Sequence, residues 1–362
     1  MPDNAPRVAF YISGHGFGHA ARMAPVIHRL AAQGVTVFVR SGAAPKFFAD
    51  VPGVHLHQEH YDVGAVQLDG LNVDVAETLA RCAALHAHRD EVIAREAAFI
   101  RQQDVRLIVG DIVPIAFAIA AAAGIPAIAA SHFTWDWIYE PYIAAHPHYA
   151  YLREAIRADY AQAALALQMP FAHDFSVFPA VEPIPLIVRR VTHTRAAMRA
   201  AFDVPDGAKL AVLSMGGMAW GTSPLKALRA LRGWVFVLPP DMTALAGDAP
   251  NFRAVPPGYA HFHDLTAASD LVIAKAGGVT VSECIAYQVP LIYTFRENFR
   301  EDELLRPALE TYAHARFFEK AAFEQGAWIE AIEPFMAEAP RWRPLATDGA
   351  AVMTAKITAW LD

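Results

Sequence analysis

Cysteine is scarce in this chain. Only Cys82 and Cys284 occur among 362 residues, and the amino terminus carries no basic, apolar and small-residue signal sequence. A fold built on a disulfide framework is therefore excluded, and we expect the protein in the reducing cytoplasm.

The sequence also lacks residues at the spacing that metal ligands usually have. The 16 histidines are scattered, and pairs such as His86/His88 and His261/His263 have no cysteine or carboxylate companion at ligand spacing. The sequence therefore predicts no metal site.

The chain also lacks basic clusters and uninterrupted apolar runs. Its 37 acidic residues outnumber the 30 basic ones, and no cluster could follow a phosphate backbone. The most apolar stretch, 107–130, has the length of a bilayer span, but it is interrupted by Asp111, Pro114, Gly124 and Pro126. We therefore expect no nucleic-acid partner and no transmembrane segment, while peripheral membrane contact and oligomeric state stay open.

What is present is typical of a folded protein of two domains. Hydrophobic residues make up 55% of the chain and charged residues 19%, which predicts a sizeable buried core. Single cores stop growing at about 250 to 300 residues, so a chain of this length favours two.

Short β-rich runs alternate with alanine-rich helical stretches in both halves. The predicted strands are 8–13, 35–40, 54–57, 106–110 and 126–131, then 209–214, 234–238, 252–255, 270–275 and 290–295. Such alternation implies right-handed crossovers and parallel sheets. We therefore predict an α/β protein made of two Rossmann-like domains.

A proline-rich segment marks the predicted boundary. Residues 178–185 contain three prolines, which lack an amide donor and disfavour regular structure, so we place a hinge near 180–192. The first domain would span 1–185 and the second 186–345. The remaining segment, 346–362, would form a helix that packs back on the first domain.

A glycine-rich turn at 13–19 separates the first predicted strand from the first helix. Three glycines within five residues let a backbone approach a ligand closely, at a helix start whose amides are unpaired. The spacing departs from the dinucleotide-binding fingerprint, because His19 stands where the third glycine is expected. Arg40 and Ser41 also stand where an acidic ribose ligand is expected. Hydride transfer is therefore not expected.

A second glycine turn follows the predicted strand that ends at Lys275. The amides of Gly277, Gly278 and Val279 would face an anion such as a pyrophosphate, near a helix that begins around Thr280. An ordinary tight turn between strand and helix is the alternative.

Two neighbouring features would complete such a nucleotide site. Glu283, one turn into the helix, could accept hydrogen bonds from ribose hydroxyls, or could be a first-turn carboxylate favoured by the helix dipole. Gly216 and Gly217 follow an adjacent predicted strand and could reach the same phosphates, since ligands of open parallel sheets lie at the carboxyl ends of the strands.

Taken together, these motifs resemble a known family. The two glycine turns look like those of GT-B glycosyltransferases, and the second is similar to the corresponding stretch of MurG-type N-acetylglucosaminyltransferases. A closer resemblance is to the glycosyltransferase-like amino-terminal region of plant L-arabinokinases and its bacterial relatives. It spans about residues 8 to 310 and is carried by segments 14–20, 111–114, 133–139, 299–302 and 305–306.

The resemblance implies two Rossmann-like domains that face each other across a cleft, with a nucleotide sugar on the second. It assigns Glu283 to the ribose, Glu301 and Asp302 to the hydroxyls of the donor sugar, and Lys275 to the phosphates as a counter-charge. The diphosphate would contact Gly216, Gly217, Gly277, Gly278, Val279 and Thr280. The MurG pattern has glutamines where Glu301 and Asp302 stand here, which weakens the case for N-acetylglucosamine as the donor sugar.

The nucleobase contact would come from the segment around Phe262 and His263. Either ring could stack on or cap a base, whereas core packing is the alternative for Phe262. A UDP-sugar is the expected donor substrate, and no cofactor is expected besides it.

The same resemblance places a general base in the first glycine turn. His19 and Asp111 match the histidine and aspartate of inverting enzymes, in which the imidazole takes the proton of the acceptor and the carboxylate fixes its tautomer. His15 competes for the role of the base. His19 could instead bond the loop backbone, and Asp111 could cap the helix that begins near Pro114.

Aromatic residues crowd one segment after the strand at 126–131. Phe133, Trp135 and Trp137, together with Gly16 and Phe17 of the first turn, would form a wall for the acceptor, which could be a small molecule, a glycan or a lipid. A hydrophobic mini-core beneath a long loop is the alternative for Trp135 and Trp137.

These expectations lead to one main hypothesis and two rivals. The first is an inverting, metal-independent glycosyltransferase that moves a sugar from a nucleotide diphosphate sugar to an acceptor. The second keeps the fold but is a nucleotide-sugar epimerase or hydrolase, and the third is a non-catalytic protein that binds nucleotide sugars.

Overall fold

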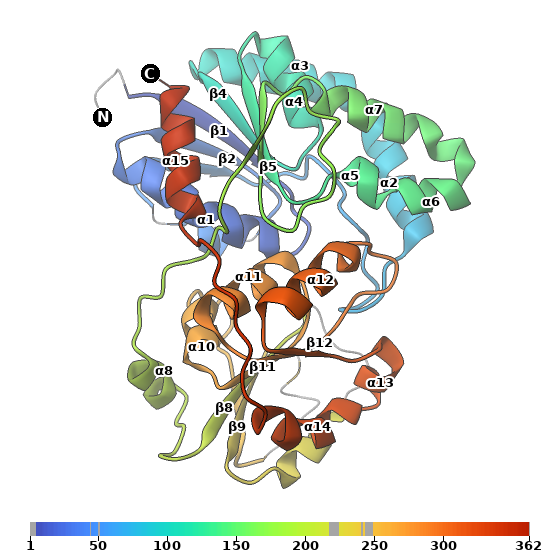
Figure 1. Cartoon of the computed structure of the whole chain (residues 1–362). Helices are drawn as coiled ribbons and strands as arrows, with labels where there is room; N and C mark the ends of the chain where they lie inside the picture. Colours follow the sequence, from blue (N-terminus) through green and yellow to red (C-terminus); the bar gives the residue numbers. More distant parts are fainter. Residues whose placement is uncertain are drawn as a thin grey trace. The chain divides into compact units, whose positions relative to one another are not determined.

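A computed structural model describes residues 5–43, 45–49, 51–216, 224–239, 242 and 249–361. The chain forms two compact units. Unit 1 comprises residues 1–66, 74–188 and 346–362, and unit 2 comprises residues 67–73 and 189–345. Each unit is an α/β structure built on one parallel sheet (Figure 1).

Unit 1 contains a seven-stranded parallel sheet in the order β3-β2-β1-β4-β5-β6-β7. Its central strands are mostly apolar and almost entirely buried, as expected where helices cover both faces of a parallel sheet. The strands are β1 (Arg7–Ile12), β2 (Thr36–Arg40), β3 (Val54–His57), β4 (Leu107–Asp111), β5 (Ala127–Ser131), β6 (Leu165–Gln168) and β7 (Val181–Pro183).

The helices of unit 1 include one from the far end of the chain. Met353, Ile357 and Leu361 join the same apolar core as helix α1, and Figure 1 shows α15 in red beside α1 in blue. The helices are α1 (Gly18–Ala32), α2 (Val75–Ala87), α3 (Arg89–Gln102), α4 (Ile115–Ala123), α5 (Trp135–Ile138), α6 (Glu140–Ala145), α7 (Ala150–Tyr160) and α15 (Gly349–Ala359), with 3-10 turns at Pro45–Phe47 and Pro147–Tyr149.

Unit 2 repeats the plan with a six-stranded parallel sheet in the order β10-β9-β8-β11-β12-β13. Its strands are β8 (Lys209–Ser214), β9 (Trp234–Leu238), β10 (Phe252–Ala254), β11 (Leu271–Lys275), β12 (Leu291–Thr294) and β13 (Ala315–Phe317). Its helices are α8 (Arg195–Ala201), α10 (Phe262–Ala268), α11 (Gly278–Tyr287), α12 (Asp302–Tyr312), α13 (Lys320–Glu324) and α14 (Ala327–Met336), with a 3-10 helix at Pro224–Ala230.

The ten predicted strands all form, within one or two residues at their ends. The α/β prediction with two Rossmann-like sheets is confirmed. Sequence reasoning missed β6, β7 and β13. Strand β7 lies inside the proline-rich segment predicted to be irregular. It is an edge strand, and an edge strand tolerates proline because its outer side needs no hydrogen bond to a neighbouring strand.

The units divide the chain between residues 188 and 189, whereas the sequence placed the boundary between 185 and 186. Segment 67–73, assigned by sequence to the first domain, clusters with unit 2. There Leu71 enters the apolar core and its carbonyl accepts a hydrogen bond from the amide of Glu297.

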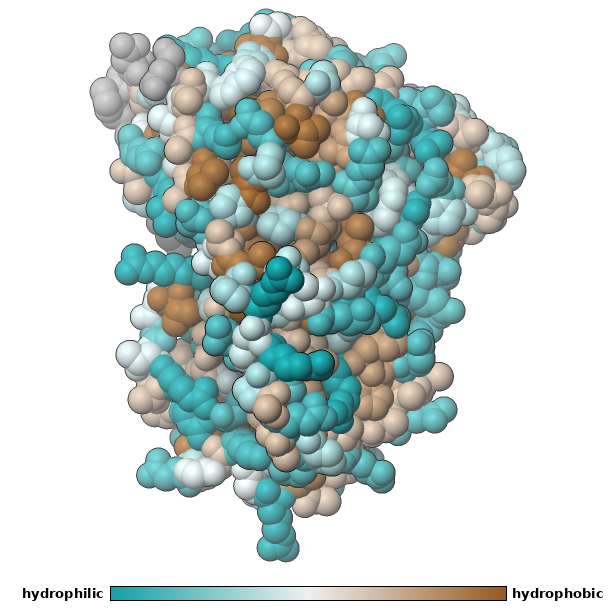
Figure 2. All heavy atoms as spheres, viewed as in Figure 1, coloured by the Kyte–Doolittle hydropathy of each residue, from teal (hydrophilic) through white to brown (hydrophobic). Residues whose placement is uncertain are grey.

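The surface is mixed in polarity. On the face drawn in Figure 2, hydrophobic residues are dispersed among hydrophilic ones. None of the helices in the described part of the chain is long and apolar enough to cross a membrane.

Candidate functional site

A buried cluster of charged and polar side chains lies at the carboxyl ends of β1, β4 and β5 in unit 1. Asp111 is the last residue of β4 and is fully buried, and its Oδ1 lies 3.0 Å from Nδ1 of His19 in the first turn of α1. Strands β1 and β4 are neighbours at the point where the strand order reverses, which is where open α/β sheets bind ligands. The structure thus joins the two residues predicted as the catalytic pair.

Arg22 completes this cluster, and sequence reasoning missed it. Its Nε lies 3.3 Å from Asp111 Oδ2 and its second guanidinium nitrogen donates to Asp111 Oδ1, so the arginine binds both carboxylate oxygens. Its remaining nitrogen lies 2.9 Å from Nδ1 of His132, which follows β5. Arg22 stands one helical turn after His19 on a face that points into the protein, and this spacing was the only signal in the sequence.

The charge balance in the cluster favours an ionised aspartate. Burial alone raises the pKa of the Asp111 carboxyl, but the guanidinium of Arg22 and the imidazole of His19 outweigh it and hold that pKa below its usual value. Nδ1 of His19 also lies 3.1 Å from the Arg22 nitrogen that already donates to Asp111 Oδ1. We assign the proton to Nδ1, because a hydrogen bond from Nδ1–H to the carboxylate is charge-assisted. The lone pair then lies on Nε2, as a general base requires.

His15 is held differently. Its Nδ1 lies 3.2 Å from the amide of Ala65, and its own amide donates to Ser13 Oγ at 3.2 Å. One ring nitrogen is therefore engaged by backbone. His19, the other candidate base, has a carboxylate partner in Asp111.

The predicted acceptor residues separate into two groups. Phe133 and Trp135 are buried, and their rings lie 5.8 and 6.3 Å from that of His19. Trp137 instead stacks on His173 at 4.8 Å. Phe17 is exposed and packs near Phe47 under the ammonium of Lys46, and Gly16 beside it is exposed. Only Phe133 and Trp135 thus come to the catalytic pair.

A cavity in unit 1 opens beside these residues. It has about 530 Å³ of empty space, counting its open mouth, and is lined mostly by apolar and aromatic side chains of α2, α5 and α7. Trp135 lines it, with its indole Nε1 donating to Asp62 Oδ2 at 2.9 Å. Burial raises the pKa of Asp62, against hydrogen bonds and the nearby His19 that lower it.

The second glycine turn lies at the corresponding point of unit 2. Lys275 ends β11, which neighbours β8 where the strand order reverses. Its side chain lies against both glycine turns: a Cβ built on Gly277 or Gly216 would come within 3.0 or 3.4 Å of its Nζ. Gly216 also has a φ of 72°, which favours glycine, whereas Gly217 lies outside the described residues.

The electrostatics of Lys275 are unusual. Burial and the charge of Arg296 lower the pKa of its ammonium to about 7, although Glu301 opposes them. A negative charge bound beside such a lysine would favour its protonated form.

The start of helix α11 already has one carboxylate partner. The amide of Gly278 donates to Glu301 Oε1 at 3.0 Å, with Gly277 as the residue before the helix. Val279 and Thr280 follow in the first turn and are half-buried. Asp302 begins α12 and its pKa is raised by burial. The helix start is thus able to bind an anionic oxygen.

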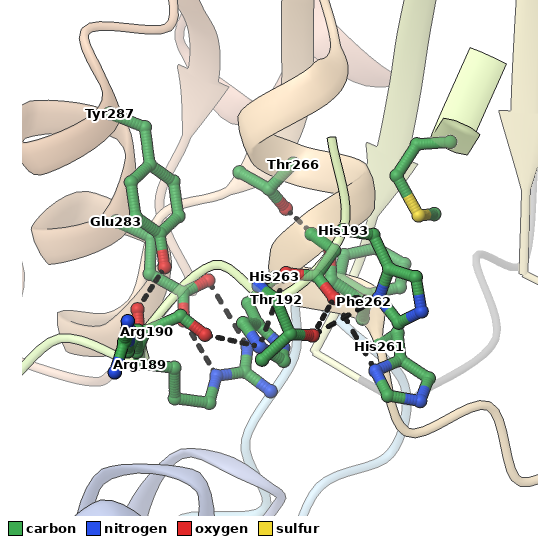
Figure 3. Close-up of polar contacts among 12 residues, drawn as sticks. Arg189, Arg190, Thr192, His193, His261, Phe262, His263, Thr266, Glu283 and Tyr287 are labelled. Carbon is green, nitrogen blue, oxygen red and sulfur yellow. Dashed lines mark hydrogen bonds and ion pairs between the residues drawn. The ribbon is translucent and has the colours of Figure 1, made fainter. Parts of the chain in front are cut away.

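Glu283 is buried and ion-paired. Arg189 donates to its two oxygens at 2.7 and 3.1 Å, and the hydroxyl of Tyr287 donates to the Arg189 carbonyl at 2.6 Å (Figure 3). Sequence reasoning missed Arg189, because it lies 94 residues from Glu283. Ribose hydroxyls would have to share this carboxylate with the guanidinium.

The predicted nucleobase residues begin helix α10. His263 is buried, with Nε2 3.2 Å from the Arg190 carbonyl, and burial together with Arg189 lowers its pKa. Phe262 is half-buried and packs against an apolar cluster of unit 2. Core packing therefore accounts for part of the Phe262 side chain.

Known proteins are similar to this chain in sequence or in fold. No protein-family model matches the chain. It is 31% identical over 339 residues to the L-arabinokinase of Arabidopsis thaliana, an alignment that covers 90% of this chain and 32% of that protein. The chain thus spans about a third of the length of the curated relative it matches.

Solved structures match over nearly the whole chain. The glycotransferase of kitacinnamycin aligns with a TM-score of 0.64 at 16% identity, covering 99% of this chain and 95% of the other. MurG of Acinetobacter baumannii aligns with a TM-score of 0.55 at 14% identity, covering 98% and 99%.

This chain has the GT-B fold. The predicted resemblance to GT-B glycosyltransferases and to L-arabinokinases is confirmed at the level of fold and sequence similarity. A protein of Listeria monocytogenes assigned as a UDP-N-acetylglucosamine 2-epimerase also shares the fold, with a TM-score of 0.57 at 13% identity over 99% of this chain and 96% of that one. The fold alone therefore does not choose between transfer and epimerisation.

Proposed function

We propose that this protein is an inverting, metal-independent glycosyltransferase that moves a sugar from a nucleotide diphosphate sugar to a hydroxyl or amine of an acceptor. The observation that carries the proposal is the buried hydrogen bond between His19 Nδ1 and Asp111 Oδ1. In the proposed step, His19 Nε2 takes the acceptor proton while the acceptor atom bonds to the anomeric carbon. The bond from that carbon to the phosphate oxygen breaks, and a single displacement inverts the configuration.

The donor would bind on unit 2. The amides at the start of α11 and the Lys275 ammonium are proposed to hold the diphosphate, stabilising the charge that develops as it leaves. Glu283 would bind the ribose, and Glu301 and Asp302 the sugar hydroxyls. This donor set supplies positive charge from the chain itself, so the transfer step would need no metal ion or other cofactor.

The cavity of unit 1 is proposed as the acceptor site. Its apolar and aromatic lining favours a flat, weakly polar molecule, and Asp62 supplies one buried group that fixes its orientation. Trp135 lines the cavity, and its ring also approaches that of His19. A small aromatic or alicyclic alcohol or amine therefore suits this cavity better than a charged glycan.

Turnover of nucleotide sugars tests the proposal. The protein is incubated with UDP-, TDP-, GDP- and ADP-sugars, with and without a panel of small aromatic alcohols, and free nucleotide diphosphate is followed together with product mass. Release that depends on an acceptor, with a glycosylated product of inverted anomeric configuration, supports transfer. Binding of donors without any turnover would overturn it in favour of a non-catalytic binding protein.

An epimerase or hydrolase is the second candidate, and the carboxylates Glu297, Glu301 and Asp302 favour it together with the epimerase-like neighbour in fold. The same assay separates the two. Diphosphate release without an acceptor, or an isomeric sugar product, would support this reading instead.

A further inference from the structure

Two histidines and an aspartate that are distant in the sequence converge in unit 2. His193 precedes α8, whereas His261 and Asp264 belong to the start of α10. Figure 3 shows the rings of His193 and His261 next to each other, and their centroids are 4.6 Å apart. No role in sugar transfer has been given to any of these three residues.

The potential ligand atoms are close to one another. Asp264 Oδ2 lies 2.6 Å from His193 Nδ1 and 3.4 Å from His261 Nδ1, and the three atoms all lie within 4.8 Å of one another. Ligands in a tetrahedral zinc site lie about 2.0 to 2.2 Å from the ion, so neighbouring ligand atoms are separated by roughly 3.3 Å. Shifts of the order of an ångström would bring this set to that geometry.

The aspartate is fixed in place by a second set of contacts. The amide of Thr192 donates to Asp264 Oδ1 at 2.8 Å and its hydroxyl donates to Oδ2 at 2.7 Å. Metal ligands are commonly oriented in this way by neighbouring hydrogen bonds. The carboxylate is fully buried, while the two imidazoles are about half exposed, so an ion could enter from solvent.

We propose that His193, His261 and Asp264 form a binding site for a divalent transition-metal ion, and that Zn²⁺ is the ion they suit. Two imidazoles and one carboxylate match the preference of Zn²⁺ and disfavour Mg²⁺, which requires mostly oxygen ligands. Three protein ligands leave the fourth position to water. His263 is not part of the set, because its Nε2 faces the Arg190 carbonyl and the other oxygen of Asp264.

The ion would fasten the segment 189–193 to helix α10. That segment also carries Arg189, the partner of Glu283, so occupancy would steady the donor side of unit 2 without taking part in the transfer step. Sequence reasoning did not find this set. It saw no carboxylate companion for His261 and His263, although Asp264 stands three residues after His261, and His193 comes from a distant segment.

Metal titration of the full chain tests the proposal. The protein is stripped with a chelator and titrated with Zn²⁺ by calorimetry and with Co²⁺ by its visible absorption. We expect one Zn²⁺ with micromolar or tighter affinity, tetrahedral Co²⁺ bands, and a higher melting temperature with Zn²⁺ than without.

Variants identify the ligands. His193→Ala and His261→Ala should each lower Zn²⁺ affinity by at least about tenfold, as loss of a metal-ligand contact does. His88→Ala, an exposed histidine of unit 1, is the matched control and should bind Zn²⁺ like the parent. Because Asp264→Asn could disturb the Thr192 contacts, the two histidine variants decide the question. A parent that binds no Zn²⁺ or Co²⁺ specifically, or equal affinities in parent, His193→Ala and His261→Ala, would overturn the proposal.

Discussion

The two units have the same sheet plan but opposite charges at the same topological position. In unit 1 the fourth strand along the chain, β4, ends in Asp111, and in unit 2 the fourth strand, β11, ends in Lys275. Both residues are buried beside a glycine turn that follows the first strand of the unit. A shared fold thus places functional side chains without deciding their chemistry.

The surroundings of these residues explain their different tasks. Arg22 and His19 compensate the buried charge of Asp111 and keep it ionised. Burial and the nearby Arg296 outweigh the partial compensation from Glu301, so the pKa of Lys275 falls to about 7. In the proposed function, the first site orients the base and the second receives the diphosphate.

The largest expected effect is on the base of unit 1. His19→Ala should lower kcat by about 10² to 10⁴, the usual contribution of a general base, while leaving nucleotide diphosphate affinity unchanged. Turnover is followed by acceptor-dependent diphosphate release, and affinity by calorimetry. His15→Ala is the matched control and should retain most of the activity. Full activity in the His19 variant would remove the proposed difference between the units.

Arg22 is expected to stabilise unit 1 and to set the pH dependence of its proposed base. Arg22→Met leaves the buried Asp111 with a single polar partner from the cluster, so we expect unfolding to become easier by about 3 to 5 kcal/mol. Without the Arg22 guanidinium the pKa of the Asp111 carboxyl should rise, which would move the acidic limb of the pH–rate profile to higher pH. Denaturant unfolding and the pH dependence of kcat/KM measure the two effects, and an unmoved acidic limb would show that Arg22 is structural only.

Lys275 should couple nucleotide binding to proton uptake. At pH 8 the Lys275 side chain of the unliganded protein is mostly deprotonated, and a bound diphosphate should raise its pKa. The affinity for UDP should therefore fall by up to about tenfold per pH unit above pH 7. Lys275→Met should remove this dependence and weaken UDP about tenfold to a hundredfold, as expected for a charged hydrogen bond, with little effect on uridine. Calorimetry in buffers of different ionisation enthalpy measures both the affinity and the proton uptake. Equal losses of affinity for UDP and for uridine would contradict the phosphate role.

The last expected effect is on the pH dependence of stability. The pKa of Lys275 is near 7 in the folded state, so between pH 7 and about 10 the folded protein binds fewer protons than the unfolded protein. The lysine therefore destabilises the fold most at and below pH 7. The gain in stability of Lys275→Met over the parent should therefore be largest near pH 7 and shrink as the pH rises to 10. Melting curves of the two proteins across this range provide the measurement, and a constant difference would show that Lys275 is not desolvated.

Strands and glycine turns were predictable because their signals are local. The runs at 54–57, 209–214 and 234–238 form strands with those bounds, since β-branched and aromatic residues between turn signals specify them directly. Short edge strands gave too little signal: β7 spans only Val181–Pro183 and contains a proline. The pairing of His19 with Asp111 was reached through a family resemblance rather than through spacing.

The sequence by itself determined the two parallel sheets and the glycine turns, because periodicity and backbone freedom are properties of short segments. The candidate pair of His19 and Asp111 came from the family resemblance. Only the tertiary structure decided which charged side chains pair with one another. It brought Arg22 to Asp111, Arg189 to Glu283 and His193 to Asp264, across separations of up to 94 residues. Buried charges must be compensated by whatever group the fold brings near, and that partner is set by packing rather than by distance along the chain.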